Sequence, residues 1–313
     1  MVNLPVETPV EVEEELGAEP PPKKAVAIRS RSDRLFDAGV NVGLLLVMLA
    51  AVVPLLVVVT ASFTPYAEIL KNGGYTLLPR AFTLDGYRAV LADARLQQGF
   101  VVSVFITVVG VAINMVVSVL FAYPLSQPTM PGRRGWLFFA ILTTLFNAGI
   151  IPTFLVVQAT GLLNTVWAMI IPTTVSVFNV LILKTFFEGL PSSLFEAARI
   201  DGLGEWRILL KIVIPLSLPV LMTIGLFYAV GQWNTFMTAV LYVRDQSLQP
   251  LQVVLRDMLT EASSDSPVEA DAVVPTVTYR MAAVVLTALP MIVIYPFIQK
   301  HFRHGVLLGS VKE

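Results

Sequence analysis

Long runs without a charged residue alternate along this chain with shorter segments in which charged residues gather. The uncharged runs cover residues 38–67, 97–132, 135–183, 212–243 and 281–299. A helix needs about 20 apolar residues to cross a bilayer, and the run 135–183 is long enough for two. The runs are continuously apolar rather than alternating, which favours helices over barrel strands. The pattern predicts an all-α membrane protein with six transmembrane helices, over 38–61, 99–123, 136–157, 163–183, 216–242 and 281–299.

The polar segments predict how the rest of the chain is organised. Residues 1–34 hold a glutamate-rich stretch, three prolines and a basic stretch, with too few large apolar residues to offset the entropy cost of ordering. We therefore expect a disordered tail over 1–34, a membrane domain over 35–300 and a short tail over 301–313. A glycine-initiated turn at 161–165 separates the third and fourth helices. The first apolar run is too long for a signal-peptide core, so we expect it to remain as an uncleaved anchor.

Composition agrees with a membrane protein. Apolar residues make up 56% of the chain and charged residues 14%, whereas soluble domains carry about 25% charged residues. The net charge of −1 does not suggest a nucleic-acid partner. The chain has no cysteine, which excludes disulfides and thiolate chemistry.

Lysine and arginine predict the orientation. With both termini in the cytoplasm, the inner segments hold more of these residues than the outer ones, among them Lys23, Arg133 and Arg207. This distribution follows the positive-inside rule. It places the polar loop at 184–215 in the cytoplasm, whereas residues 68–96 and 244–280 form outer loops.

The loop at 184–215 is expected to contain a short capped helix. Ser193 as N-cap and Glu196 three residues later form a capping-box pattern. Gly202 is placed to end the helix in the left-handed conformation. A two-turn helix is marginal alone in water, so it needs a surface to pack on, and Leu194, Phe195 and Ala198 offer one. An apolar stripe then follows at helical spacing, and Pro215 stands where the next membrane helix is expected to begin. The stripe consists of Trp206, Leu209, Leu210 and Val213.

The same loop carries a motif that is rare by chance. Glu196-Ala197-Ala198 is followed by Asp201-Gly202, then by Ile212 and Pro215. From average residue usage, this spacing should occur well below about once in a million starting positions. It resembles the cytoplasmic loop of the inner-membrane permeases of binding-protein-dependent ABC importers, among which the carbohydrate-uptake subfamily looks most similar to this chain. Residues 295–302, with Gly305 and residues 309–312, resemble the ending of a branch that imports oligosaccharides. Leu203 and Ile214 depart from the alanine and leucine that are usual in the family.

The resemblance implies a fold, partners and a location. Two permease chains, usually different, would form a pore in a bacterial plasma membrane, with two ABC ATPase subunits beneath them. An extracytoplasmic solute-binding protein would deliver a sugar or oligosaccharide. The loop would be the coupling helix that docks into an ATPase. Its contact residues would be Glu196, Ala197, Ala198, Asp201, Gly202, Ile212 and Pro215.

Candidates for a solute pathway rest on residue type. Tyr228, Gln232, Trp233 and Asn234 combine aromatic faces with amides, as sugar contacts require, and Asn147 and Asn179 are further amides in apolar runs. Such amides also join helices to one another, which is the alternative reading.

The remaining sequence motifs argue against chemistry within this chain. It contains no phosphate-binding loop for ATP, so ATP hydrolysis is expected in a partner chain. It has neither zinc-protease nor serine-hydrolase motifs, and His301 and His304 lie in the tail without a third ligand. We expect no catalytic residue, metal site or cofactor. An importer of a non-sugar solute and a self-contained secondary carrier remain as alternatives. The second would require inverted repeats or charges inside the membrane.

Overall fold

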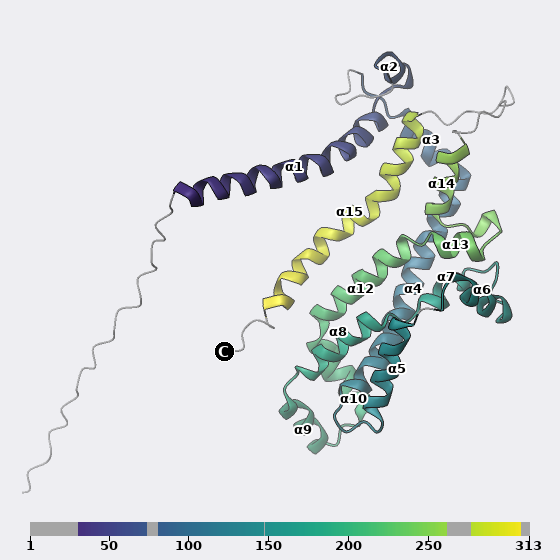
Figure 1. Cartoon of the computed structure of the whole chain (residues 1–313). Helices are drawn as coiled ribbons and strands as arrows, with labels where there is room; N and C mark the ends of the chain where they lie inside the picture. Colours follow the sequence, from purple (N-terminus) through teal and green to yellow (C-terminus); the bar gives the residue numbers. More distant parts are fainter. Residues whose placement is uncertain (1–30, 74–80, 147, 262–276, 308–313) are drawn as a thin grey trace, which may run out of the picture. The chain divides into compact units, whose positions relative to one another are not determined.

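The computed structural model describes residues 31–73, 81–146, 148–261 and 277–307 (Figure 1). Its contacts divide the chain into two units, one ending at Val53 and the other beginning at Pro54. All regular structure in the described residues is helical. Several predictions fall outside them: most of the tail over 1–34, Asn147, much of the second outer loop, and residues 308–313.

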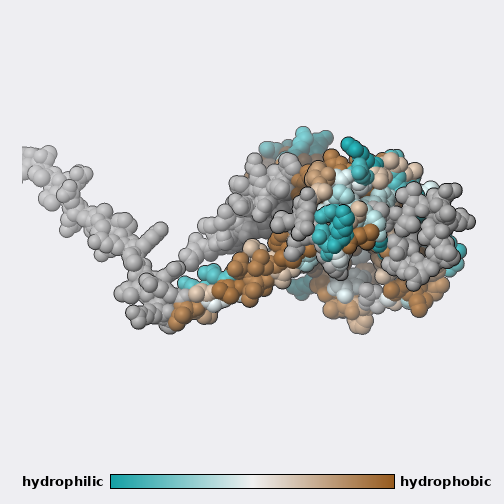
Figure 2. All heavy atoms as spheres, turned by 90° about the horizontal axis from the view of Figure 1, so that it is seen from above, coloured by the Kyte–Doolittle hydropathy of each residue, from teal (hydrophilic) through white to brown (hydrophobic). Residues whose placement is uncertain are grey.

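Three single helices are long and apolar enough to cross a membrane. They are α1 (Arg31–Ser62), α4 (Ala94–Ser126) and α15 (Val277–Leu307), the last through its portion Val277–Ile294. Large apolar side chains are exposed along these and other membrane helices, as expected of surfaces that face lipid (Figure 2).

Three further spans are bent pairs of helices. The first joins α5 (Arg133–Leu145) to α6 (Ile150–Ala159). The second joins α7 (Trp167–Ile170) and the 3₁₀ turn η1 (Ile171–Thr173) to α8 (Val177–Glu188), with a bend of 50°. The third joins Glu205–Leu216 to α12 (Leu218–Trp233), with a bend of 83°. Counted this way, the described part of the chain holds up to six spans, which agrees with the predicted all-α six-helix fold.

Shorter helices occupy the loops. The segment between α1 and α4 contains α2 (Tyr66–Lys71) and α3 (Asp85–Ala92), and the one before α15 contains η3 (Gln246–Leu248) and α14 (Leu251–Glu261). The loop after α8 contains α9 (Ser192–Ile200). The short helices α10 (Glu205–Ile208), η2 (Leu209–Val213) and α11 (Ile214–Leu216) then make up the first half of the third bent pair.

Several helix ends differ from the bounds expected for the spans and tails. α1 starts within the expected N-terminal tail, at Arg31, and α15 continues into the expected C-terminal tail, to Leu307. The fifth helix ends at Trp233, and its C-cap residue Asn234 donates both its backbone N–H, at 3.1 Å, and its side-chain Nδ2, at 2.8 Å, to the carbonyl oxygen of Val230. Residues Met237–Tyr242 form a separate helix, α13.

The core is organised around α4, which packs against α8, α12, α3 and α14. Two glycines permit close approach. A Cβ at Gly110 would lie 2.9 Å from the Gln232 side chain of α12, and one at Gly99 would lie 3.1 Å from Val254 of α14. The Ser103 hydroxyl accepts a hydrogen bond from the Leu251 N–H, at 2.8 Å, and satisfies the start of α14.

The turn predicted at 161–165 is present, and Asn164 holds it to a second segment. Asn164 has a φ of 59°, and its N–H donates to the carbonyl of Tyr242 at 2.8 Å. Its side-chain oxygen accepts from the N–H groups of Arg244 and Asp245, at 3.0 and 2.8 Å. One residue therefore ties the turn before α7 to the end of α13.

Two replacements of Asn164 should separate the contribution of its side-chain hydrogen bonds from that of its backbone conformation. Asn164→Ala loses both side-chain hydrogen bonds and places a Cβ residue at positive φ, so we expect it to lower the free energy of unfolding by about 1–3 kcal/mol. Asn164→Gly loses the same hydrogen bonds without the backbone strain and should be less destabilised. Thermal unfolding of the purified protein in detergent measures the difference, and an alanine variant as stable as wild type would contradict this role.

Candidate functional site

The loop helix α9 (Ser192–Ile200) begins at a proline rather than at the predicted Ser193 cap. Pro191 is the N-cap residue, with φ −58° and ψ 127°, and no side chain caps the helix. The fixed φ of proline suits this position, so the helix starts before Ser193. The predicted capping box between Ser193 and Glu196 is therefore wrong.

The predicted end of α9 is confirmed at Gly202. This residue has a φ of 75°, and its N–H donates to the Arg199 carbonyl at 3.1 Å. The next N–H, of Leu203, reaches back to the Ala198 carbonyl at 3.0 Å. This pair of bonds is a Schellman motif, and Leu203 packs against the core, as an apolar residue in that position commonly does. Asp201 is the exposed C-cap residue.

The two faces of α9 have different surroundings. Phe195 and Ala198 are buried in a core cluster with residues of α4 and α8, whereas Leu194 is partly exposed. Most of the predicted contact face is thus packed against other helices of this chain. The opposite face is exposed at positions i, i+3, i+4 and i+7, and we call it the outer face of α9. It consists of Ser193, Glu196, Ala197 and Ile200.

The segment after α9 departs from the predicted apolar stripe. It comprises α10 (Glu205–Ile208), a π-helical turn η2 (Leu209–Val213) and α11 (Ile214–Leu216). Leu209 and Val213 are buried as expected, but Trp206 and Leu210 are exposed, and Ile208 is fully buried instead. A π-turn contains an extra residue, which rotates the helix and changes the buried face.

Pro215 lies next to this irregularity. It is exposed and lacks the N–H that would continue the α-helical pattern, and Ile212 is partly buried against the core. The sharp bend follows at Ser217, so the membrane helix α12 starts after Pro215 rather than at it.

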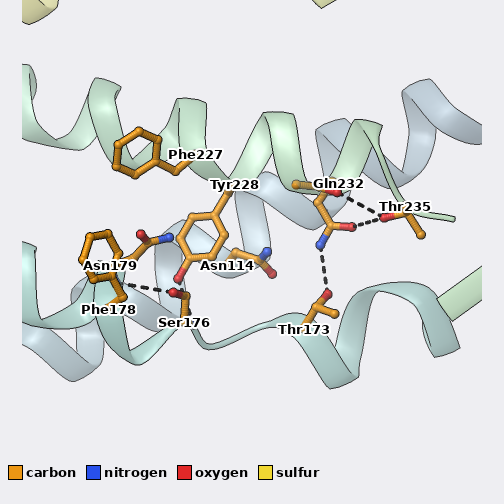
Figure 3. Close-up of a pocket in the computed structure, with 10 residues that line it drawn as sticks. Asn114, Thr173, Ser176, Phe178, Asn179, Phe227, Tyr228, Gln232 and Thr235 are labelled. Carbon is orange, nitrogen blue, oxygen red and sulfur yellow. Dashed lines mark hydrogen bonds between the residues drawn. The ribbon is translucent and has the colours of Figure 1, made fainter. Parts of the chain in front are cut away.

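A second candidate site is a polar cavity of about 520 Å³ among α4, η1, α8 and α12 (Figure 3). Amides, hydroxyls and three aromatic rings surround it, and none of its lining residues is charged. They are Asn114, Thr173, Ser176, Phe178, Asn179, Phe227, Tyr228, Gly231, Gln232 and Thr235.

Hydrogen bonds fix the lining residues in place. The Tyr228 hydroxyl accepts from the Ser176 N–H, at 3.2 Å, and lies 2.6 Å from the Ser118 hydroxyl of α4. The Gln232 amide donates to the Thr173 hydroxyl, at 3.2 Å. The side-chain oxygen of Asn114 is buried and has no hydrogen-bond partner among the described residues. Asn114 thus holds a buried, unpartnered acceptor at the edge of the cavity.

The structure brings some of the predicted pathway residues together and not others. Tyr228, Gln232 and Asn179 share the cavity. Trp233 does not line it: its indole N–H donates to the Thr287 carbonyl, and its ring meets Phe100 edge-on. Trp233 and Asn234 border a separate, largely apolar cavity beside α15.

Helical geometry explains this division. Tyr228 and Gln232 are four residues apart and share a face of α12, whereas Trp233 is rotated by about 100° from Gln232. Sequence reasoning did not include Thr173, Ser176 and Thr235, which line the same cavity. The sequence gives little indication that these three residues line a cavity, because small hydroxyl residues are common in membrane helices and often bond only to the backbone of their own helix.

Comparison with known proteins decides what kind of membrane protein this is. Residues 25–307 match the family of the binding-protein-dependent transport system inner membrane component. The chain belongs to this family. It is 45% identical to the polygalacturonan/rhamnogalacturonan transport system permease protein YtcP of Bacillus subtilis, over 90% of this chain and 99% of that one. It is 42% identical to protein LplC of the same organism, over 83% and 89%.

A solved structure agrees with these matches. It is that of a bacterial ABC transporter involved in the import of the acidic polysaccharide alginate, and one of its chains is 33% identical to this one. The TM-score is 0.81, over 88% of this chain and 99% of that one. The predicted resemblance to ABC-importer permeases is therefore confirmed, and with it the permease fold.

Gly110 should be needed for the position of Gln232. In Gly110→Ala the new Cβ would displace the Gln232 amide and break its bond to Thr173, lowering the free energy of unfolding by about 1 kcal/mol. In a Gln232→Ala background the same change should be neutral or stabilising, because alanine favours a helix over glycine. Gly225→Ala is the control, since its nearest neighbour is 3.9 Å away. Thermal unfolding of the four variants measures the coupling, and equal losses in both backgrounds would contradict it.

Proposed function

We propose that this chain forms half of the translocation pore of an ATP-driven importer and that its solute is an oligosaccharide. A second permease chain, of different sequence as is usual in the family, would complete the pore. Two ABC ATPase subunits would bind on the cytoplasmic side and hydrolyse ATP, and an extracytoplasmic solute-binding protein would deliver the solute.

The observation that carries the proposal is the outer face of α9. Its residues are exposed although the helix itself is anchored by Phe195, Ala198 and the Schellman motif at Gly202. Ile200 is 86% exposed, an apolar side chain beside the acidic Glu196. A rigid, capped helix that presents apolar and charged groups together suits docking into a cleft of another protein. Glu196 would be the charged contact, and Ala197 would allow close approach.

The polar cavity supports a sugar as solute. Amides and hydroxyls exchange hydrogen bonds with sugar hydroxyls, and the rings of Phe178 and Phe227 offer apolar faces. Tyr228, Gln232, Asn179 and Asn114 would line the pathway in this half of the pore. The names of YtcP and of the alginate importer make oligosaccharides of uronic acids the first solutes to test.

Orientation follows from the positive-inside bias. We place both termini and the α9 loop in the cytoplasm, and the segments between α1 and α4 and between α13 and α15 outside.

Reversing the charge of Glu196 should break docking. Glu196→Lys is expected to weaken binding of the ATPase by at least about tenfold, because it places a cation where the interface receives a carboxylate. The membrane domain should still fold, since the side chain is exposed. Co-purification of the ATPase and uptake of labelled oligogalacturonate by proteoliposomes measure the two effects.

A matched control is Asp85→Lys, which reverses another exposed charge in the segment between α1 and α4. It should leave ATPase binding unchanged. Normal ATPase binding by Glu196→Lys, at equal expression, would rule out the outer face of α9 as the docking surface.

The orientation can be tested by single-cysteine labelling, because the chain has no native cysteine. In right-side-out vesicles, an impermeant maleimide should label Arg88→Cys on α3 and leave Arg207→Cys on α10 unlabelled until the membrane is permeabilised. Both native residues are exposed, so access is limited by the membrane alone. Labelling of position 207 in intact vesicles would overturn the proposed orientation.

A further inference from the structure

Three segments of the chain meet at the carboxylate of Glu205, the first residue of α10. The Tyr123 hydroxyl of α4 donates to one carboxylate oxygen, at 2.6 Å. The Arg199 guanidinium of α9 binds the other, at 3.1 Å, and also reaches the side-chain oxygen of Gln127, at 3.4 Å. We call these four residues the Glu205 cluster. It links the loop to the end of α4 by directional polar contacts.

The contact to Tyr123 is the part of the cluster that should matter most. The Arg199–Glu205 pair is partly exposed, with side chains 42% and 55% accessible, and such pairs contribute little by themselves. Tyr123 is 6% exposed, so its hydroxyl depends on Glu205 for an acceptor. Bonds to a charged acceptor are also stronger than those between neutral groups.

Apolar packing alone would position α9 less strictly. Phe195 and Ala198 share a core cluster with Tyr123 and Leu125, but such contacts are non-directional. A hydrogen bond requires a defined distance and angle. The Glu205 cluster therefore adds directional contacts between the loop and α4 to the apolar cluster that holds the loop against α4.

The same helix α4 continues to the polar cavity. Asn114 and Ser118 lie on it, and Ser118 contacts Tyr228. Ser118 and Tyr123 are separated along the helix by roughly 7.5 Å, from the rise of 1.5 Å per residue. α4 thus connects the loop end to the cavity without a break in its helix.

We propose that Glu205 and Tyr123 are positioning residues that transmit movement of α9 to the cavity through α4. The proposal rests on the proposed function, in which α9 is moved by the ATPase. In this proposal, the ATPase displaces α9 through its outer face, and the contacts of the Glu205 cluster pass that displacement on to α4. Loss of the cluster should leave the ATPase bound and active but reduce the amount of solute imported per ATP hydrolysed.

The test uses the assembled complex with ATPase, second permease and binding protein, reconstituted in proteoliposomes with labelled oligogalacturonate as probe. Tyr123→Phe removes only the hydroxyl and leaves the buried ring. We expect normal complex yield and ATPase binding, with the ATP hydrolysed per solute imported rising at least about threefold. Glu205→Ala should have the same effect or a larger one. Tyr242→Phe, which removes the hydroxyl of another buried tyrosine, on α13, should leave the ratio unchanged.

A second readout is independent of the solute. Spin labels at Ser192→Cys on α9, which lies outside the outer face, and at Val116→Cys on α4, both exposed, report the distance between the loop and α4. The distance distribution should be narrow in the otherwise wild-type complex and should broaden when Tyr123→Phe is added. Unchanged ATP-to-solute ratio and unchanged distribution in Tyr123→Phe would overturn the proposal, even if Glu205→Ala fails to assemble.

The two proposals fail in different ways. If α9 does not dock the ATPase, Glu196→Lys will bind the ATPase normally. If α9 docks but the Glu205 cluster does not transmit movement, Glu196→Lys will lose ATPase binding while Tyr123→Phe behaves as wild type.

Discussion

The close contact of α4 with α12 is the constraint on which the rest of the described structure depends. Gly110 lets the Gln232 side chain lie against the α4 backbone, and this places Tyr228 of α12 within reach of Ser118. Tyr228 in turn accepts from the Ser176 N–H, so that α8 is held to the same pair. The polar cavity is the space left among these three helices, lined by groups that their contacts already orient. A larger residue at Gly110 would therefore alter the cavity through Gln232.

The loop depends on the same helix at its other end. α9 is too short to be stable alone in water, and its inner face supplies the missing stability by packing beside Tyr123 and Leu125. That packing leaves the outer face exposed, as the proposed docking role requires. The two alanines of the motif thus have opposite surroundings: Ala198 is buried in the core, and Ala197 is exposed next to Glu196.

Sequence reasoning predicted those features that depend on composition and local geometry. The six apolar segments, the turn at Asn164 and the left-handed Gly202 follow from hydrophobicity and from backbone preferences of single residues. It failed where tertiary contacts decide. Ser193 does not cap α9 because Pro191 already begins it, and Trp206 is exposed because the π-turn at Leu209–Val213 shifts the buried face. Trp233 was grouped with Gln232 by chemistry, although one step along a helix turns it toward α15.

The neutrality of the cavity has a consequence for how energy reaches it. A charged group among membrane helices costs several kcal/mol, and carriers that use ion gradients accept this cost because the charge binds the driving ion. The lining residues of this cavity are amides, hydroxyls and aromatic rings, and none of them is charged. In the proposed function, work enters instead as movement of the walls. In that proposal α4, which runs as one helix from the cavity to the Glu205 cluster, would carry the movement, and the directional contacts at its end would be where coupling is built.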